Sequence, residues 1–415
     1  MPKFDVVVAG GGLAGCAAAI AAARDNAETI LIERYGSLGG MATNGLVAPF
    51  MKYHAGSEQL IAGIFQELID KLKKFSKDAL YIRAFDPEAL KMVLYDFLIE
   101  SKVQLLLHSY ITEVNKKEKN IKSLTVENKS GKTKINGKIF IDATGDGDIG
   151  AKSGAEIEIG DNRGHTQALT LMFRIGNVNI RHVIDYCKKN KQDFKFIEDE
   201  NIISIAGFSS LIEKERKGEK YSVPLDYIFF TTSPRKDIII VNSTRILYKN
   251  ALNADDLTRA EIEGHRQAWM IFNLLKQNVP GLENSYLMDT GTQVGIRATR
   301  RITGEYVLTK EDILSFKKFS DAIAKNNYPI DIHSPDDKNG KWIPLPEGEY
   351  YDIPYGCLIA KGIDNLLVAG RCISATHEAQ GSIRIMPVCV ATGEAAGKAA
   401  GKCIKYNILP RQVKV

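Results

Sequence analysis

The stretch VVVAGGGLAGCAAAI, residues 6–20, decides the fold of this chain. It begins in a β-branched run, residues 3–9, which is typical of a strand buried in a parallel sheet. It ends in the alanines of residues 14–24, which predict a helix with side chains small enough to pack closely on that sheet. A second apolar strand is expected at residues 29–32. The order strand, helix, strand predicts a parallel βαβ unit.

Three glycines, Gly10, Gly12 and Gly15, separate the first strand from the helix with the spacing G-x-G-x-x-G. Gly10 permits a tight turn, Gly12 lets backbone N–H groups approach a pyrophosphate, and Gly15 lets helix and strand pack closely. Glu33 ends the second strand, 18 residues after Gly15, where a carboxylate accepts hydrogen bonds from ribose hydroxyls. With this context, a dinucleotide site is favoured over the alternative of a purely structural glycine turn.

The residues after Glu33 indicate which dinucleotide the turn holds. A carboxylate at this position disfavours a 2′-phosphate, so NADP is not expected. Arg34 follows directly, and the segment GGMAT at residues 39–43 carries a glycine pair that brings a second backbone segment close to the cofactor. Loosely held NAD does not need a cradle of this length, whereas a larger, buried cofactor does. The sequence therefore favours FAD.

The rest of the chain divides into regions with two different sequence patterns. Near the N-terminal end, Asp86 as N-cap and Pro87 at the first position predict a helix to about Ser101. Other elements expected outside the middle region are a strand at 103–107, short strands within 110–141 with a hairpin tip at 128–131, strands at 138–142 and 365–369, and a small-residue helix at 386–404. In the middle region we expect antiparallel strands at 169–174, 227–231 and 238–242, and helices at 254–277 and 310–325.

These elements predict an α/β chain with two domains. Residues 1–154 and 355–415 are expected to form a Rossmann-like FAD-binding domain with a parallel central sheet, and residues 290–306 to lie close to its cofactor. Residues 155–354 are expected to form an inserted α+β substrate domain with an antiparallel sheet.

Several motifs resemble those of the FAD-dependent oxidoreductase family, within the glutathione-reductase-like two-dinucleotide-fold superfamily. More narrowly, the chain is similar to the bacterial group labelled "FAD-dependent oxidoreductase", some members of which carry the label xanthan lyase. The resemblance rests on the segments GGGLAG (10–15), Glu33 with GGMAT (39–43), DATGD (142–146), GIRATRRITGE (295–305) and NLLVAGRCISATHEAQGS (365–382). It covers both ends of the chain well and the middle poorly.

The resemblance implies a set of FAD contacts. They are Gly10, Gly12, Leu13, Ala14, Gly15, Glu33, Arg34, Gly39, Gly40, Met41, Ala42, Thr43, Ala143, Thr144, Gly145, Gly370, Arg371, Gly381, Ser382 and Ile383. Many relatives have Asp where this chain has Arg371; Arg only donates, so it is expected to pair with the pyrophosphate. The stretch from Gln380 to Arg384 is expected to present N–H groups to the flavin edge, as in relatives.

A second G-x-G-x-x-G match, Gly145–Gly150, is not expected to bind a nucleotide. Two aspartates inside this turn, Asp146 and Asp148, would repel a pyrophosphate, and no second strand with a terminal acidic residue follows. We therefore expect no separate NAD(P)H domain.

His377 is the sequence's best candidate for acid–base chemistry, because it lies between the FAD strand and the expected flavin contact. The alternative is a structural, hydrogen-bonded histidine. Arg297, Arg300 and Arg301 form a cluster that would capture an anionic substrate or support the reduced flavin, or else form ordinary ion pairs. Of these residues, His377, Arg297 and Arg301 are our catalytic candidates.

Composition limits the remaining possibilities. A net charge of +5 over 415 residues does not indicate nucleic acid binding. Six cysteines without a C-x-x-C pair predict free thiols and a cytoplasmic protein without a metal site. No membrane span is expected, because no stretch reaches about 18 uninterrupted apolar residues.

The expected function is that of an FAD-dependent oxidoreductase that acts on a small organic substrate. A donor or acceptor protein is a possible further partner. One alternative is an electron-transfer flavoprotein subunit that relays electrons between partner proteins. Another is an RNA-modifying or thiazole-forming flavoenzyme, although the basic extension or motifs of such enzymes are not apparent.

Overall fold

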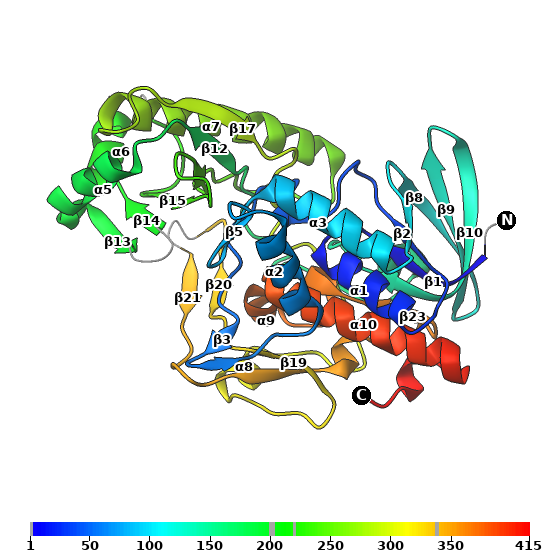
Figure 1. Cartoon of the computed structure of the whole chain (residues 1–415). Coiled ribbons are helices and arrows are strands. Elements are labelled where there is room, and N and C mark those ends of the chain that lie inside the picture. Colours follow the sequence, from blue (N-terminus) through cyan, green and yellow to red (C-terminus); the bar gives the residue numbers. More distant parts are fainter. Residues whose placement is uncertain (1–2, 199–203, 219–220, 337–339) are drawn as a thin grey trace.

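The structure is a computed structural model that describes residues 3–198, 204–218, 221–336 and 340–415. A mostly parallel sheet with helices α1 (Leu13–Arg24), α3 (Pro87–Glu100) and α10 (Met386–Tyr406) packed beside it forms one part of the molecule (Figure 1). A second, antiparallel sheet covered by the long helix α7 (Ala254–Asn278) forms the other. The predicted α/β fold with a parallel sheet and separate antiparallel sheets is confirmed.

The parallel sheet is built around the opening stretch of sequence. Strand β1 pairs in parallel with β2 and β10, and the βαβ unit of the first 32 residues is as predicted. Seven strands take part: β7 (Gln104–Leu106), β2 (Thr29–Ile32), β1 (Lys3–Ala9), β10 (Gly131–Asp142), β9 (Asn120–Asn128), β8 (Tyr110–Lys117) and β23 (Leu366–Val368). The predicted strand at 138–142 is the second half of β10. Its first half forms the expected hairpin with β9.

Helices α1 and α10 cross with their backbones almost in contact. Gly393 and Gly397 lie four residues apart on α10 and face α1. A Cβ added at Gly393 would lie 2.1 Å from the carbonyl oxygen of Ala14, and one at Gly397 would lie 2.2 Å from that of Ala18. The small residues of both helices thus bring the C-terminal helix onto the helix that follows the glycine turn.

Helix α3 begins as the sequence predicts. The carboxylate of Asp86 accepts hydrogen bonds from the backbone N–H groups of Glu88 and Ala89, and Pro87 occupies the first turn. The same carboxylate pairs with Nε of Arg235 at 2.8 Å. This buried N-cap therefore also ties α3 to the antiparallel region.

The antiparallel region has a core of its own, which runs from Phe173 to Leu282. Its six strands, in spatial order, are β13 (Phe194–Glu198), β14 (Ser204–Gly207), β15 (Ile228–Thr232), β16 (Ile239–Val241), β12 (Phe173–Gly176) and β17 (Tyr286–Thr290). Helices α5 (Ile180–Lys189), α6 (Ser209–Lys217) and α7 complete it. The strands predicted at 227–231 and 238–242 and the helix at 254–277 are confirmed. Of the strand predicted at 169–174, only its end belongs to β12.

The helix predicted at 310–325 is wrong over most of its length. Only Lys310–Leu314 is helical (α8), and Phe316 adopts φ +52°, which ends the helix. Ala322–Asn326 is strand β19, which pairs with β22 (Tyr351–Pro354). This segment forms a strand because its backbone pairs with that of β22. If the segment were helical, the N–H and C=O groups at this edge of β22 would lack partners.

Several described residues between 302 and 353, a range which we assigned to the insert, pack with the first core. Ile302, Ile330 and Ile353 are buried in the same cluster as the residues of β1 and β23. The separate core of the antiparallel region is formed by the six-stranded sheet and its helices.

Short elements complete the described residues. They are β3 (His54–Ala55), β4 (Glu58–Gln59), α2 (Ile64–Phe75), β5 (Leu80–Tyr81), β6 (Ala84–Phe85), α4 (Asp148–Ser153), β11 (Ile157–Ile159), β18 (Arg300–Ile302), β20 (Ile330–Ile332), β21 (Lys341–Ile343) and α9 (His377–Ile383), with 3-10 turns at Gly40–Ala42, Lys191–Asp193, Tyr355–Leu358, Gly370–Cys372 and Pro410–Gln412. All six cysteines are free, as predicted. Within the part of the chain that the structure describes, no helix is both long and apolar enough to cross a membrane.

Candidate functional site

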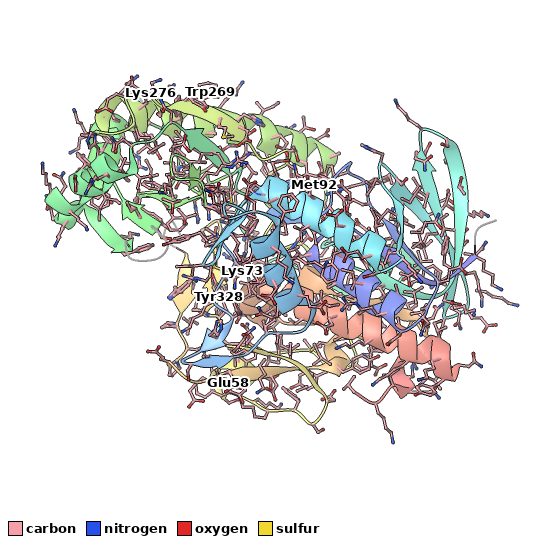
Figure 2. All side chains as sticks on the ribbon, in the orientation of Figure 1. Glu58, Lys73, Met92, Trp269, Lys276 and Tyr328 are labelled. Carbon is pink, nitrogen blue, oxygen red and sulfur yellow. The ribbon has the colours of Figure 1, made fainter. Side chains whose placement is uncertain are left out.

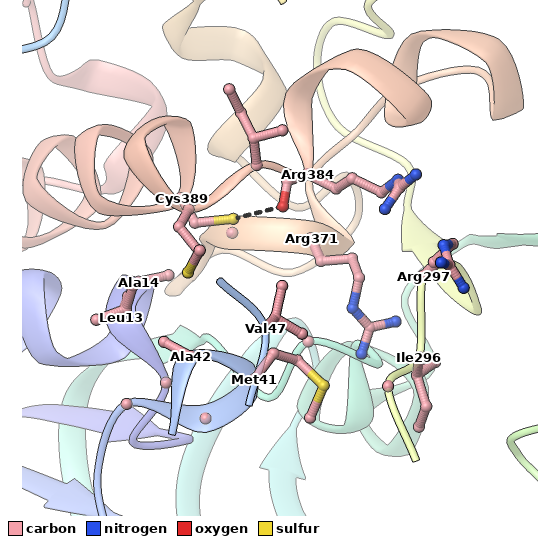
Figure 3. Close-up of a pocket in the computed structure, with 18 of the residues that line it drawn as sticks. Leu13, Ala14, Met41, Ala42, Val47, Ile296, Arg297, Arg371, Arg384 and Cys389 are labelled. Carbon is pink, nitrogen blue, oxygen red and sulfur yellow. Dashed lines mark hydrogen bonds between the residues drawn. The ribbon is translucent and has the colours of Figure 1, made fainter. Parts of the chain in front are cut away.

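A cavity lies at the carboxyl ends of the parallel strands, and Arg297, Arg371 and Arg384 are among the residues that line it (Figure 3). Segments that follow β1, β2, β10 and β23 form one end of it, and residues from the antiparallel region and from β20 form the other. The predicted site residues in its wall are Gly10, Gly12, Leu13, Ala14, Glu33, Arg34, Gly39, Gly40, Met41, Ala42, Ala143, Thr144, Gly145, Arg297, Gly370 and Arg371. In open parallel sheets this edge is where ligands bind.

The glycine turn at the start of α1 leaves room for a ligand at one position only. Gly10 has φ +97°, and a Cβ at Gly15 would lie 1.8 Å from the carbonyl oxygen of Gly10, so both are fixed by the protein's own packing. A Cβ at Gly12 would instead have a single neighbour, the Cα of Gly40 at 4.0 Å, and would stand in the cavity. Gly12 is also the N-cap of α1 and provides no side-chain cap, so the first N–H groups of the helix face this space.

The loop after β2 is fixed to the glycine turn through Glu33. Its carboxylate accepts hydrogen bonds from the backbone N–H groups of Gly11 (2.5 Å) and Tyr35 (2.9 Å), and it lines the cavity. Next to it, the Tyr35 hydroxyl and Nη2 of Arg34 both donate to Oε1 of Gln293. Residues near 290–306 therefore do reach the predicted cofactor segments.

Arg371 lies in the cavity wall (Figure 3) and joins the segments that follow the neighbouring strands β23 and β10. Its guanidinium pairs with Asp146 at 2.8 Å and donates to the Thr299 hydroxyl. Burial opposes ionisation of Asp146, but the Arg371 cation and the Thr299 hydroxyl hold the pKa of this carboxyl below its usual range. Asp146 thus serves as a counter-ion at the cavity wall.

Asp142, at the end of β10, holds the segment that follows it. One carboxylate oxygen accepts from the backbone N–H and hydroxyl of Thr144, and the other accepts from the N–H groups of Ile149 and Gly150. These four hydrogen bonds position the loop of Ala143–Gly145 along the cavity.

The other end of the cavity is strongly charged. Arg297, Asp331, His333 and Arg384 all line it, together with Tyr328, which Figure 2 shows beside β20. Nη2 of Arg384 donates to Oδ2 of Asp331 at 3.1 Å, and Nε2 of His333 lies 3.2 Å from the same oxygen.

The local environment fixes the charges of these groups. Burial, followed by the Arg384 guanidinium, lowers the pKa of Arg297 to about 10, so this side chain is a cation at neutral pH. Burial and then the Arg297 cation lower the pKa of His333 to about 4, so its ring is neutral. Burial opposes ionisation of Asp331, but its contacts with His333 and the two guanidiniums hold its pKa well below the usual range.

Two of the three catalytic candidates lie away from the cavity. After Cys372 the chain runs beside Leu308, and Thr376 donates to its carbonyl, so His377 is carried toward Arg301. There, burial and then the Arg301 cation lower the pKa of His377. Arg301 is buried and donates from Nε and Nη2 to Glu158 and to the carbonyls of Gly160 and Ala375, while its Nη1 has no acceptor among the described residues. These hydrogen bonds link Arg301 to other segments of the chain, which is a structural role.

The remaining predicted contacts lie behind the cavity wall. Thr43 is buried and donates to the carbonyl of Leu38, and Gly15 packs under the turn. Gly381, Ser382 and Ile383 lie in α9, which packs on β20. The Ser382 hydroxyl contacts the Tyr351 hydroxyl of β22. The chain returns to the cavity one residue later: Arg384, Ile385 and Met386 line it.

Sequence reasoning missed several cavity residues. Tyr328, Asp331 and His333 lie in a stretch with no motif, and only their place in or beside β20 brings them to the site. Arg384 belongs to the stretch expected to cover the flavin edge, so a signal existed. The expectation for this stretch concerned its backbone N–H groups and not the Arg384 side chain.

The fold and the cavity define a flavoprotein of the dinucleotide-binding type, and comparison with known proteins agrees. Residues 5–415 match the family described as FAD dependent oxidoreductase, so the chain belongs to this family and is an FAD-dependent enzyme. Among solved structures, p-nitrophenol 4-monooxygenase from Pseudomonas putida shares the fold with a TM-score of 0.52 and 12% identity, over 98% of this chain and 81% of that one. A geranylgeranyl bacteriochlorophyll reductase-like protein from Thermoplasma acidophilum gives a TM-score of 0.50 and 13% identity, over 98% and 80%.

The residues present fit FAD. The open position beside Gly12, the uncapped N-terminus of α1 and the cation of Arg371 supply the donors and space that a pyrophosphate needs. Glu33 and Arg34 lie at the same end of the cavity, where the adenosine is expected.

Proposed function

We propose that this enzyme transfers electrons, as hydride or singly, between FAD and a small organic substrate bound at the charged end of the cavity. The observation that carries the proposal is the continuity of one cavity, from the glycine turn at Gly12 to the group of Arg297, Asp331 and His333. When bound, FAD supplies the electron carrier, while the protein supplies binding and orientation.

We further propose His333, rather than His377, as the group that exchanges a proton with the substrate. Its Nε2 faces the ionised carboxylate of Asp331, which only accepts hydrogen bonds, so Nε2 carries the proton. In the neutral ring, Nδ1 is then the unprotonated nitrogen. Asp331 fixes this tautomer, and Arg384 fixes Asp331.

The test is an anaerobic reduction screen on purified holoenzyme. The visible spectrum reports bound flavin, and bleaching of its bands by candidate organic substrates reports electron transfer. With a substrate found, His333→Gln should slow bleaching by about 100-fold or more. His377→Asn, a matched loss of a histidine outside the cavity, should bleach at the rate of the native enzyme.

A protein that purifies without flavin and takes up none would contradict the proposal. Bleaching by a reduced protein donor but by no small molecule would favour the electron-transfer subunit instead. Equal rates for His333→Gln and the native enzyme would remove His333 from proton transfer and leave the flavoenzyme assignment intact.

A further inference from the structure

Arg297 is a half-buried cation in the cavity wall, with donors that no described residue engages. Both of its hydrogen bonds leave from Nη1, to the carbonyl of Ala168 (2.9 Å) and to the Thr170 hydroxyl (2.7 Å). Within the described part of the chain, no carboxylate pairs with it and no acceptor engages its Nε or Nη2. Those two donors form the fork of a guanidinium that suits a carboxylate bidentately.

A second arginine has spare donor capacity at the same place. Arg384 lies in the cavity wall and donates from Nη2 to Asp331, but its buried Nε has no acceptor among the described residues. A buried donor of this kind costs free energy unless a ligand satisfies it. Figure 3 shows Arg297 and Arg384 beside the same space.

The charges around this space do not cancel. Asp331 is the single carboxylate among the described residues that lines this end of the cavity, and Arg384 and His333 already contact it. A ligand with a negative charge would therefore be attracted, whereas a neutral one would leave the Arg297 cation unpaired.

The neighbouring wall is apolar. Val47, Met51, Met172, Ile296 and Tyr328 line the same cavity. An apolar wall beside a cationic fork fits an organic acid better than a bare inorganic anion. None of the contacts of Arg297 involves the turn of residues 10–15, so this subsite is separate from the pyrophosphate position.

We propose that Arg297 and Arg384 form a carboxylate-binding subsite, and that the substrate of this enzyme is an organic carboxylate with an apolar body. This inference rests on the proposed function, since it places the substrate in the cavity that holds FAD. It identifies the carboxylate as the charged group that orients the substrate. It does not specify the reaction at the other end of the substrate.

The experiment titrates oxidised holoenzyme, in a buffer without carboxylates, with butanoate and benzoate. Binding is followed by the change in the visible flavin bands. We expect saturable perturbation by the two carboxylates and none by butanamide and benzamide, which have the same bodies without the charge. Arg297→Gln should weaken carboxylate binding by about tenfold or more while flavin content is retained. Arg297→Lys should recover part of it.

Arg411→Gln is the matched control, because Arg411 pairs with Asp364 at the surface and does not line the cavity. It should bind carboxylates as the native enzyme does. Yellow enzyme that responds to no carboxylate, or equally to acid and amide, would overturn the subsite but not the flavoenzyme. If Arg297→Gln loses FAD while native enzyme shows no carboxylate response, Arg297 serves the cofactor instead and the proposal fails.

Discussion

Gly12 and Gly15 lie three positions apart and meet different demands. At Gly15 the protein itself fills the space a side chain would take, with the Gly10 carbonyl 1.8 Å from an added Cβ. At Gly12 the neighbouring protein atoms leave the space open, and φ of −67° is accessible to any residue. Folding therefore requires Gly15, whereas we expect Gly12 to be required by the cofactor.

This difference predicts opposite outcomes for two substitutions to alanine. Gly12→Ala should fold as the native apoprotein does but bind FAD about 1–3 kcal/mol more weakly, because its methyl group occupies the pyrophosphate position. Gly15→Ala should destabilise the apoprotein by at least as much. Urea unfolding of the apoproteins and titration with FAD separate the two effects. Native FAD affinity in Gly12→Ala would place the pyrophosphate elsewhere.

At the level of single residues, the sequence predicted the cavity residues beside the glycine turn far better than those at the charged end of the cavity. Gly12 and Glu33 follow from the geometry of a βαβ turn, which local sequence encodes. His333 reaches the cavity only through the placement of β20, and no local pattern reports that placement. His377 was chosen for its proximity in sequence to the FAD strand, but the pairing beside Leu308 carries it away from the cavity.

The crossing of α1 and α10 is the packing that places the glycine turn against the C-terminal segment. If intrinsic helix propensity alone determined stability, alanine would be favoured over glycine at each glycine position of α10 by about 1 kcal/mol. Close approach decides instead, because Gly397 faces the Ala18 carbonyl with no room for a methyl group.

Gly397→Ala should therefore destabilise the protein despite its higher helix propensity. An added Cβ would lie 2.2 Å from the Ala18 carbonyl oxygen, so the helices must separate, at a cost of about 1–3 kcal/mol. Lys398→Ala is the control, because it removes only an exposed ion pair with Glu394 and should cost about 0.5 kcal/mol or less. Both are measured by urea unfolding. A more stable Gly397→Ala would show that the helices do not approach this closely.

Elements were predicted well where one periodic pattern was long enough. The helix Ala254–Asn278 continues over many turns with one buried stripe, so its length and period were plain. The segment 310–325 contains a short helix, a turn at Phe316 and the start of a strand. Its few apolar residues are compatible with a helix or a strand. Pairing with β22, which is distant in sequence, determines that residues 322–326 form a strand.

At the scale of the whole molecule, residues of the parallel-sheet region and of the antiparallel region line the same cavity. Met172, Asn242 and Arg297, from the antiparallel region and the segments next to it, line it together with the turn of the parallel sheet. A cofactor held there contacts both regions, so its binding free energy adds to the stability of each. The ion pair of Arg235 with Asp86 joins the same two regions outside the cavity.

The two tryptophans report these regions separately: Trp269 lies on the outer side of α7 (Figure 2), and Trp342 lies in β21. In Trp269→Phe and Trp342→Phe variants, the remaining tryptophan follows one region during thermal unfolding. FAD at about 100 times its Kd should stabilise by about 2.7 kcal/mol, and both midpoints should rise together. Combining each variant with Gly12→Ala, the matched control, should reduce both shifts. A shift confined to Trp342 would mean that FAD is held by the parallel-sheet region alone, and that the antiparallel region closes over it without contributing to its binding.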